Sequence, residues 1–494
     1  MANQCYLGVD LGAESGRVMA GLFDGNKITF EEMHRFSNGP VSLGGTARWD
    51  VLRLWTEIKQ GLAKAGERYG NDVISVGVDT WGVDHVLFSK NMEIMGQPYH
   101  YRDARTNGMM EEAFARVPRE DIFAETGLQF MQLNTLFQFL AAQKYTPELL
   151  EYAECMLMMP DFFHWCLSGA KVCEFTEAST SQMIHPIRKS WNLDLLKRFN
   201  LPTHIYPEIV PPGTQLGALL DSVAEETHLG KTQVVAPASH DTGSAVVAIP
   251  TANTGTPSWA YISSGTWSLV GVELQEALFT DEVLKINFTN EGGVDGTYRF
   301  LKNIMGLWLV QQSRRSFEKQ GKSLDYAELT RLAEEAPAFR SILNPDDQRF
   351  LNPPDMVEAI QSFCRETGQP VPETEGQIVR CALESLALQY DAVFKTIEKL
   401  TGVPLEVIHI VGGGSKNTLL DQFTADACNK PVWTGPIECT VLGNVLIQAR
   451  ASGAIGSLSE IRSVARNSAE MATFEPKNPD AWQEAKDRFA ALKK

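Results

Sequence analysis

The sequence has no uninterrupted apolar run of about 18 residues, the length that a membrane-spanning helix needs. The stretch that comes closest is CMLMMPDFFHWCL, and Pro160 and Asp161 interrupt it. The first ten residues, MANQCYLGVD, have neither a basic start nor a long apolar segment, so we expect no secretion signal. Together these absences predict a cytoplasmic protein without a membrane span.

An excess of basic residues is also missing. The 44 lysines and arginines stand against 61 aspartates and glutamates, which leaves a net charge of -17. A surface for nucleic acid or for an anionic membrane needs a basic footprint, so we expect neither as a partner. Small phosphate ligands are still compatible with this charge, because backbone amides and single cations bind them in acidic proteins as well.

Cysteine patterns that bind metal are absent. The eight cysteines are scattered without the close spacing of a metal site, and we expect buried thiols. Cys364 and Cys381 flank a Pro-rich turn and can approach each other, but the sequence establishes no bond between them. A Walker-type loop is absent too, since the glycine triplet at 412–414 does not match G-x-x-x-x-G-K-[ST].

What the sequence does have is a repeated pattern of glycine turns. Its 494 residues are many for one hydrophobic core, so we expect two or more domains. Two segments are typical of β-hairpins with small turn residues, CYLGVDLGAESGRVMAGLF near the start and WAYISSGTWSLVGVEL at 259–274. Downstream of each hairpin comes a buried strand that ends in a glycine-containing loop, VISVGVDTWGVD and VIHIVGGGSKN. The recurrence predicts a duplicated domain.

Helices are predicted between these strands. In VRCALESLALQYDAVFKTIEKLTG, apolar residues from Val379 to Leu400 recur at steps of three and four, and Gly402 is suited to end the helix. Strands that alternate with helices in this way favour an α/β architecture.

The two hairpins contain what a triphosphate site requires. Glycines leave room for the ligand, turn amides donate hydrogen bonds, and hydroxyl groups add further donors. These glycine and hydroxyl residues are Gly12, Gly16, Gly265, Ser15, Thr266 and Ser268. Arg17 adds a fork of donors suited to phosphate, and Asp10, at the end of the first strand, can hold magnesium. One such turn alone is usually only a turn, but two in a duplicated layout favour a phosphate site.

Several segments, taken together, resemble the FGGY carbohydrate kinases. They are VDLGAESGRV, SVGVDTWGVDHVL, YRDARTNG, ASHDTGSAV, SSGTWSLVG, LKNIMGLWLVQ and HIVGGGSKNTLL, and the resemblance runs from about residue 5 to about residue 475. It implies an α/β fold of two actin-like (ribonuclease H-like) ATPase domains with an interdomain active-site cleft. We place the N-terminal domain at 1–248, the C-terminal domain at 249–455, and a helical segment that packs back on the domains at 456–494.

The resemblance also implies an activity and its residues. The chain is expected to transfer the γ-phosphoryl group of ATP, with Mg2+, to the 1-hydroxyl of L-rhamnulose in rhamnose catabolism. The implied ATP contacts are Ala13, Glu14, Ser15, Gly16, Arg17, Thr266, Asn303, Gln311 and Gly413. The implied sugar contacts are Gly82, His240, Asp241 and Thr242, with Asp241 as the general base.

Some of these residues have simpler explanations. Asp241 is also a favoured N-cap, worth about 1 kcal/mol over Ala, and a helix N-terminus would stabilise its ionised form. Asn303 is placed where a helix is expected to start and can be its cap, while Gln311 can be a surface residue. Glu14 would repel phosphate through its side chain, so we expect only its backbone amide to contribute.

Two other functions stay open. A kinase for another ketose, such as L-fuculose or L-xylulose, differs only in the shape of its pocket. An actin-like ATPase without a sugar substrate belongs to a different class, and ADP formation that needs no ketose would identify it. The chain is expected to be a monomer or a small homo-oligomer.

Overall fold

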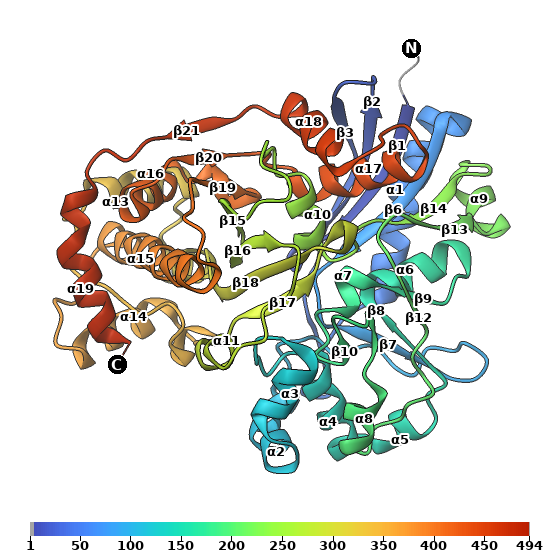
Figure 1. Cartoon of the computed structure of the whole chain (residues 1–494), viewed down its shortest axis with the longest axis horizontal. Coiled ribbons are helices and arrows are strands. Elements are labelled where there is room, and N and C mark those ends of the chain that lie inside the picture. Colours follow the sequence, from blue (N-terminus) through green and yellow to red (C-terminus); the bar gives the residue numbers. More distant parts are fainter. Residues whose placement is uncertain (1–3, 494) are drawn as a thin grey trace. The chain divides into compact units, whose positions relative to one another are not determined.

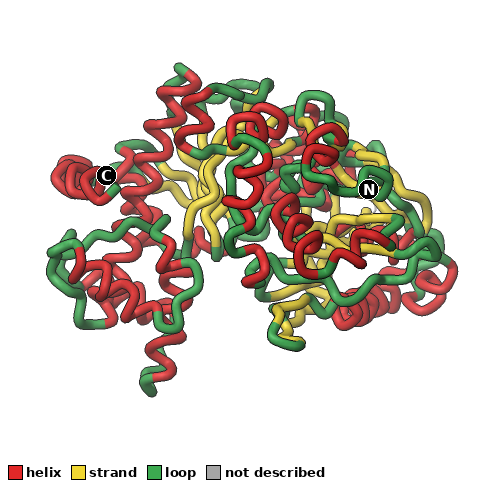
Figure 2. The backbone as a smooth tube through the Cα atoms, turned by 90° about the horizontal axis from the view of Figure 1, so that it is seen from below, coloured by secondary structure: helices red, strands yellow, loops and turns green. Residues whose placement is uncertain are grey.

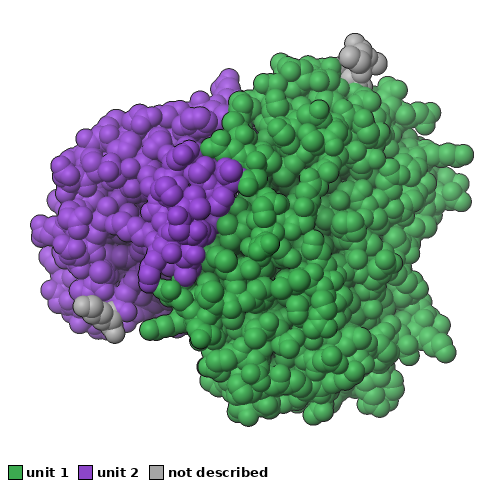
Figure 3. All heavy atoms as spheres, in the orientation of Figure 1, with its two compact units in different colours: residues 1–255, 273–300, 439–468 green, residues 256–272, 301–438, 469–494 purple. Residues whose placement is uncertain are grey.

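The computed structural model describes residues 4–493, which form two compact units (Figure 3). Unit 1 contains the residues up to 255 together with 273–300 and 439–468. Unit 2 contains 256–272, 301–438 and the residues from 469 onward. Within residues 4–493, no helix has the length and apolar character that crossing a membrane requires. The domain boundaries at 248 and 455 stay a prediction beside this division.

Unit 1 consists of one large sheet, several short strand pairs and the helices around them (Figure 1). Its strands are β1 (Gln4–Leu11), β2 (Ser15–Phe23), β3 (Ile28–Ser37), β4 (Val41–Leu43), β5 (Thr46–Arg48), β6 (Val73–Thr80), β7 (His85–Phe88), β8 (Cys155–Met158), β9 (Val172–Glu174), β10 (Ile184–His185), β11 (Ser190–Trp191), β12 (Glu208–Val210), β13 (Thr214–Ala218), β14 (Gln233–Ala236) and β17 (Thr289–Gly292). Its helices are α1 (Val51–Tyr69), α2 (Met109–Arg116), α3 (Arg119–Thr126), α4 (Thr135–Tyr145), α5 (Pro147–Glu151), α6 (Met159–Ser168), α7 (Phe175–Ala178), α8 (Leu193–Arg198), α9 (Asp221–Thr227), α10 (Asp241–Val247), α11 (Asp281–Ile286), α17 (Cys439–Ala451) and α18 (Leu458–Ser468).

The large sheet of unit 1 has the strand order β13-β14-β6-β1-β2-β3. β1 pairs antiparallel with β2 and parallel with β6, so Asp10 lies opposite Arg17 on one side and Asp79 on the other. Seven of the eight residues of β1 are buried, as expected of a central strand covered by helices on both faces. The register therefore brings charged residues to the carboxyl end of an otherwise apolar strand.

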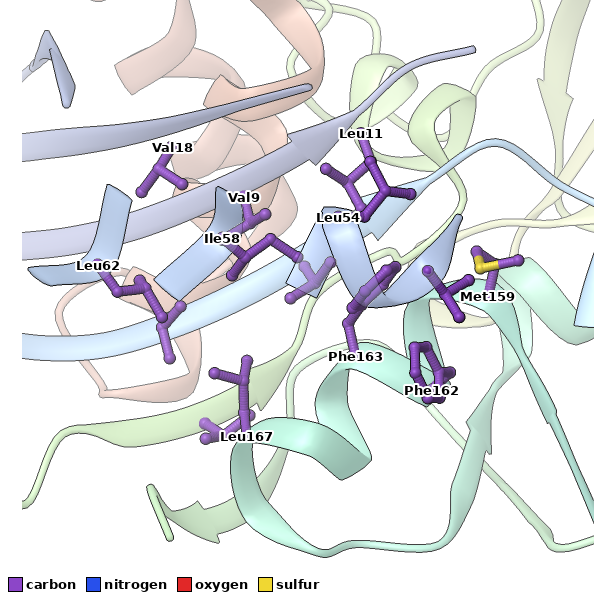
Figure 4. Close-up of a cluster of buried hydrophobic side chains, with 14 of the residues drawn as sticks. Val9, Leu11, Val18, Leu54, Ile58, Leu62, Met159, Phe162, Phe163 and Leu167 are labelled. Atoms are coloured by element: carbon purple, nitrogen blue, oxygen red, sulfur yellow. The ribbon is translucent and has the colours of Figure 1, made fainter. Parts of the chain in front are cut away.

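One face of this sheet packs on α1 and α6. Val9, Leu11 and Val18 from the sheet meet Leu54, Ile58 and Leu62 of α1, and Figure 4 shows them beside apolar side chains of α6. The α1 residues are spaced by four, which places them on one face of that helix. This cluster is the hydrophobic core that holds the carboxyl ends of β1 and β6 in place.

The opposite face of the sheet packs closely on α17. A Cβ atom added at Gly8 would lie 2.6 Å from Val441 Cγ2, so the glycine is needed for the helix to approach. Two buried amides of α17 also bond to the sheet: Asn444 Nδ2 donates to Gly77 O at 3.2 Å, and Gln448 Nε2 to Leu7 O at 2.9 Å.

Unit 2 has a second sheet flanked by helices, as Figure 2 shows by its colours. The strands that lie wholly or mostly in it are β15 (Trp259–Ser264), β16 (Trp267–Leu274), β18 (Tyr298–Met305), β19 (Val407–Val411), β20 (Val432–Thr434) and β21 (Ala472–Phe474). The helices are α12 (Trp308–Lys319), α13 (Tyr326–Glu335), α14 (Met356–Glu366), α15 (Glu375–Thr401), α16 (Thr418–Cys428) and α19 (Gln483–Leu492). Of the predicted C-terminal segment, α18 thus lies in unit 1 and α19 in unit 2.

The predicted duplication is visible in the pairing of the strands. In unit 1, β1 pairs antiparallel with β2 and parallel with β6. In unit 2, β15 pairs antiparallel with β16 and parallel with β19. Both predicted hairpins and both downstream strands are confirmed. The helix predicted over 379–400 is also confirmed as part of α15, which ends at Gly402 with φ 69°.

The contact of α1 with α9 gives a test of the fold. A Cβ atom added at Gly66 would lie 1.8 Å from the Thr227 carbonyl oxygen, and a backbone atom cannot move aside cheaply. We therefore expect Gly66→Ala to lower the free energy of unfolding by about 1–3 kcal/mol, although Ala is the better helix former. Urea denaturation measures the loss. Gln60→Ala, at an exposed position of the same helix, is the control and should stay within about 0.5 kcal/mol of the wild type; equal stability of the two variants would contradict the packing.

Candidate functional site

The predicted sugar-binding and catalytic residues all lie in unit 1. Thr80, the last residue of β6, forms an isolated parallel bridge with His240, and its N–H donates to Ser239 O at 2.9 Å. This bridge joins the loop that contains Gly82 to the start of α10, although the two segments are far apart in the sequence. The end of β6 and the segment before α10, which contain the predicted sugar contacts, thus lie side by side at the edge of the sheet where α/β proteins place their ligands.

Asp241 is the first residue of α10, and its two carboxylate oxygens differ. Oδ1 accepts hydrogen bonds from Thr242 N at 2.5 Å and from Thr242 Oγ1 at 3.2 Å, and His240 Nε2 lies 3.4 Å away. Oδ2 accepts no hydrogen bond from the residues that the structure describes, and the side chain is 34% exposed. The alternative of an N-cap is wrong, because His240 precedes the helix and no side chain caps it. Oδ2 is therefore the oxygen that is free to take a proton.

The surroundings of Asp241 favour its protonated form. Burial and the negative charge of Asp10 raise the pKa of Asp241 to about 7, while the hydrogen bonds from Thr242 act in the opposite direction. The expectation that a helix N-terminus would keep this carboxylate ionised is wrong, because burial and Asp10 outweigh a helix of 7 residues. A carboxylate with a pKa near neutrality is well matched to accept a proton from an alcohol during reaction.

Two further carboxylates lie at the same edge. Asp79 is fully buried, and burial, followed by the charge of Asp10, raises its pKa well above the ordinary value. Asn444 Nδ2 donates to Asp79 Oδ2 at 2.6 Å, but the buried Oδ1 has no hydrogen-bond partner among residues 4–493. Arg17 compensates part of the charge, since Nε and Nη2 donate to Asp10 Oδ2 at 3.0 and 2.7 Å. If Asp10, Asp79 and Asp241 all ionise, negative charge exceeds the single positive charge of Arg17 at this edge.

This excess fits a magnesium ion that is bound together with a nucleotide. Within residues 4–493 no three His, Cys, Asp or Glu side chains form a ready-made metal cage. Mg2+ does not need one, because it usually takes one or two carboxylates and completes its shell with water and phosphate oxygens. The unpartnered oxygen of Asp79 and the proximity of Asp10 are the features that a cation would relieve.

The loop after β6 holds Gly82 against His240. A Cβ atom at Gly82 would lie 3.2 Å from His240 Nε2 and 3.0 Å from Thr180 Cγ2, so a larger residue would crowd the site. The next residue, Val83, has φ 70°, an unfavourable conformation for a β-branched residue. Thr180 Oγ1 accepts the Val83 N–H at 2.9 Å, which helps to hold this strained turn.

Asp84 organises the same loop, and the sequence analysis missed it. Its Oδ2 accepts hydrogen bonds from Trp49 Nε1, Trp81 Nε1 and Tyr101 N, and its Oδ1 from Gln138 Nε2 at 2.8 Å. Trp81 belongs to the core, because it is buried and stacks on Trp49 with ring centroids 3.9 Å apart. The second aspartate of DTWGVD was the signal available in the sequence.

The predicted ATP contacts of unit 1 lie in the turn between β1 and β2 and in the first three residues of β2. Gly12 N donates to Ser15 O at 2.9 Å and closes the turn, which leaves Glu14 and Ser15 exposed. Ala13 is half-buried at the same turn. Gly16 is buried, and its Cβ atom would lie 2.4 Å from the Phe36 ring, so its small size is explained by packing alone.

The remaining predicted ATP contacts lie in unit 2. The N–H groups of Gly306 and Trp308 donate to Thr266 O, each at 3.2 Å, which ties the β15–β16 turn to the start of α12. Asn303 lies within β18 and is no helix cap, because α12 begins only at Trp308.

Two other residues of unit 2 differ in their surroundings. Gln311 is half-buried in α12 rather than freely solvated, and its buried Oε1 has no hydrogen-bond partner. Gly413 is exposed and has open space where a Cβ would be, which suits close approach of a ligand to the backbone.

The structure shows the state of the cysteines and the distance relation of Cys364 to Cys381 that the sequence left open. All eight are free thiols, and seven of them are buried. Cys364 and Cys381 do approach each other, as predicted, and the hydrogen bond between their thiols lowers the pKa of Cys364.

Two family models match the chain. The N-terminal domain model of the FGGY family of carbohydrate kinases covers residues 5–248, and the C-terminal domain model of the same family covers 260–452. A rhamnulokinase from Bacteroides thetaiotaomicron is 43% identical over 486 residues, which are 98% of this chain and 99% of that protein. A rhamnulokinase from Pectobacterium atrosepticum is 42% identical over 494 residues, which are 100% of this chain and 97% of that protein.

Solved structures of similar fold are more distant in sequence. A xylulose kinase from Lactobacillus acidophilus has a TM-score of 0.80 at 14% identity and covers 99% of this chain and 96% of its own. A Plasmodium falciparum glycerol kinase with ADP has a TM-score of 0.77 at 16% identity and covers 99% and 97%. At this identity the likeness extends to the fold, and it confirms the predicted two-domain α/β class.

The raised pKa of Asp241 makes a prediction about stability. Unfolded Asp has a pKa of about 3.9, whereas Asp241 has a folded pKa of about 7. Between these values the folded chain keeps a proton that the unfolded chain loses, so its stability falls as the pH rises. Asn cannot ionise, and we expect Asp241→Asn to raise the melting temperature of the ligand-free protein at pH 8 and to lose this gain toward pH 5.

Calorimetry at both pH values measures the difference. Asp221→Asn is the matched control, because Asp221 is also the first residue of a short helix but is exposed. It should show no gain that depends on pH. A melting temperature of Asp241→Asn below that of the wild type at pH 8 would refute the raised pKa.

Proposed function

Because the chain belongs to the FGGY family of carbohydrate kinases, we propose that it transfers the γ-phosphoryl group of ATP to the 1-hydroxyl of L-rhamnulose. As a member of this family it is a phosphotransferase that acts on a sugar. The choice of L-rhamnulose is supported by rhamnulokinases that are 40–43% identical over nearly the whole chain. The product, L-rhamnulose 1-phosphate, belongs to L-rhamnose catabolism.

We assign the proton transfer to Asp241. The observation that carries this assignment is the free Oδ2 of a carboxylate whose pKa is raised to about 7. As the sugar hydroxyl attacks the phosphorus, its proton would pass to Oδ2, while Oδ1 stays bound to Thr242. Phosphoryl transfer needs little covalent help from the protein, so the placement of the hydroxyl and one acceptor for its proton are the main requirements.

We assign the neutralisation of the phosphate charge to a magnesium ion and to other residues. Magnesium, when bound with ATP, neutralises charge on the phosphoryl oxygens, and Asp10 would hold it with Asp79 behind. Arg17 is bonded to Asp10 and would act mainly by fixing that carboxylate. The proposed ATP contacts are Ala13, Glu14, Ser15, Gly16, Arg17, Thr266, Asn303, Gln311 and Gly413, with Glu14 acting through its backbone amide. The interdomain cleft stays part of the proposal.

Gly82, His240 and Thr242 are the proposed sugar contacts. Gly82 and His240 are neighbours, which supports a common ligand for them. A cytoplasmic location is proposed as well, because ATP is the phosphoryl donor. Neither nucleic acid nor membrane is needed as a partner for this reaction.

A coupled assay of ADP formation tests the substrate. With MgATP we expect rapid turnover with L-rhamnulose and much slower turnover with L-fuculose and L-xylulose, since one unmatched hydroxyl contact can be decisive. Equal or faster turnover with another ketose would show that L-rhamnulose is not the preferred substrate. Rapid ADP formation without any ketose would instead favour an actin-like ATPase.

Substitution of the base tests the mechanism. We expect Asp241→Asn to lower kcat by at least about a hundredfold, because the amide cannot accept the proton. Binding of ATP and of the sugar, measured by calorimetry, should be retained. Asp221→Asn serves again as the control and should keep the wild-type kcat. Near-normal turnover of Asp241→Asn would show that another group takes the proton.

A further inference from the structure

A buried arginine lies behind the predicted sugar-binding histidine. Arg299, on β18, belongs to the part of this strand that lies in unit 1 and has no exposed surface. Its Nη1 is 3.0 Å from Glu291 Oε2, its Nε donates to Gly292 O at 2.8 Å, and its Nη2 to Thr176 O at 3.4 Å. The guanidinium group is thus held by acceptors on several sides, with its charge compensated by Glu291.

The same guanidinium group contacts the ring of His240. Arg299 Nη1 is 3.0 Å from His240 Nδ1. A guanidinium has donors and no acceptor, so Nδ1 is the acceptor in this hydrogen bond and carries no proton. Glu291 Oε2 lies farther from this nitrogen, at 3.5 Å, and is itself paired with Arg299 Nη1 at 3.0 Å. Burial and the positive charge of Arg299 also lower the pKa of His240 well below its ordinary value, which leaves the ring neutral. A neutral imidazole has one N–H group, and here only Nε2 remains for it.

The backbone of His240 is fixed as well. Its N–H donates to Thr176 Oγ1 at 3.2 Å, and Thr176 Oγ1 donates to the buried Glu174 Oε2 at 2.5 Å. Glu174 Oε2 also accepts the Ser239 N–H at 2.9 Å. The ring therefore has little freedom to turn, and the side that it presents is determined by Arg299.

We propose that Arg299, held by Glu291, is a positioning residue that fixes His240 in the tautomer with its hydrogen on Nε2. The inference rests on the proposed sugar kinase reaction for its catalytic meaning. Nε2 lies 3.4 Å from Asp241 Oδ1 and 3.2 Å from the Cβ position of Gly82, so its hydrogen faces both the base and the loop that contacts the sugar.

This tautomer gives His240 and Asp241 different roles. A ring with hydrogen on Nε2 can donate to a sugar oxygen or to Asp241 Oδ1, and it cannot take the proton of the attacking hydroxyl. Asp241 Oδ2, which accepts no hydrogen bond from the described residues, is then the oxygen of the pair that can take this proton. The other tautomer would present a bare Nε2 beside Oδ1, and two acceptors at 3.4 Å would repel each other.

Nitrogen NMR of the full chain tests the tautomer directly. In protein labelled with 15N-histidine, one of nine histidine spin systems belongs to His240 and is assigned by its loss in His240→Gln. We expect a protonated Nε2 and an unprotonated Nδ1 at neutral pH. A proton on Nδ1, or on both nitrogens, would overturn the proposal, whichever ketose is the substrate.

Two variants of Arg299 separate positioning from simple support. We expect Arg299→Met to lower kcat by about 10- to 100-fold, as is typical for partners that orient a functional histidine, and to remove the tautomer preference of His240. The KM for ATP should stay unchanged. Arg299→Lys keeps a donor with no acceptor, so it should restore the Nε2–H signature and most of kcat.

A second buried pair in unit 1 provides the matched control. Arg462 is equally buried and its Nη2 lies 2.7 Å from Glu273 Oε2, but among the described residues it is not a partner of His240. Arg462→Met should lower the melting temperature as Arg299→Met does and leave the His240 signature and kcat unchanged. If both variants lose kcat equally, or if Arg299→Met keeps the Nε2–H tautomer, Arg299 has only a structural role.

The test remains decisive if Arg299→Met fails to fold. Glu291→Gln combined with Arg299→Met removes both charges of the pair and avoids an unpaired buried carboxylate. The spectrum of the wild type needs no variant of Arg299 at all. If L-rhamnulose proves not to be the substrate, the comparison of variants is made with the ketose that is turned over, so the two proposals fail separately.

Discussion

The parallel pairing of β1 with β6 is the constraint on which the candidate site depends. Its register places Asp10 beside Asp79 at the carboxyl ends of two buried strands, and the helices that cover the sheet keep solvent away from them. Burial is the first cause of the raised pKa of Asp241, and the negative charge of Asp10 is the second. The charge of Asp10 also raises the pKa of Asp79, after burial. This register therefore contributes to the base strength of Asp241, to the need for a cation and to the pairing of Arg17 with Asp10.

Around this charged edge, buried polar residues fix the loops. Asp84 binds the loop after β6 through four donors, and Glu174 binds the segment before α10 through the N–H of Ser239 and the hydroxyl of Thr176. A buried polar group without a partner lowers the stability of the fold, whereas a network in which every group is bonded holds the structure rigidly. Completed networks of this kind explain how a loop with Val83 at φ 70° can keep one conformation.

Much of the fold could be predicted from local sequence, whereas much of the site could not. The hairpins and the helix α15 were predictable because alternation, a period of 3.6 residues and glycine turns are local properties. Asp84, Glu174 and Arg299 were missed because their partners are brought together only by the tertiary fold. The expectation that a helix N-terminus keeps Asp241 ionised failed for the same reason, since burial and the charge of Asp10, which raise its pKa, arise only in the tertiary fold. Residues found through the family resemblance could be assigned only because short motifs flank them.

The hydrogen bonds of a buried carboxyl group indicate whether it holds neighbouring groups in place or takes part in the reaction. Asp84 and Glu174 have bonded oxygens and act on the backbone and side chains around them. Glu177 is also buried, yet neither of its oxygens has a partner, and burial raises its pKa well above the ordinary value. It is enclosed, so it can stay neutral without contact to a substrate. Asp241 differs from all three because one oxygen is bonded, the other is free, and a third of its side chain is exposed. Only this combination holds a carboxylate in place and still lets it accept a proton.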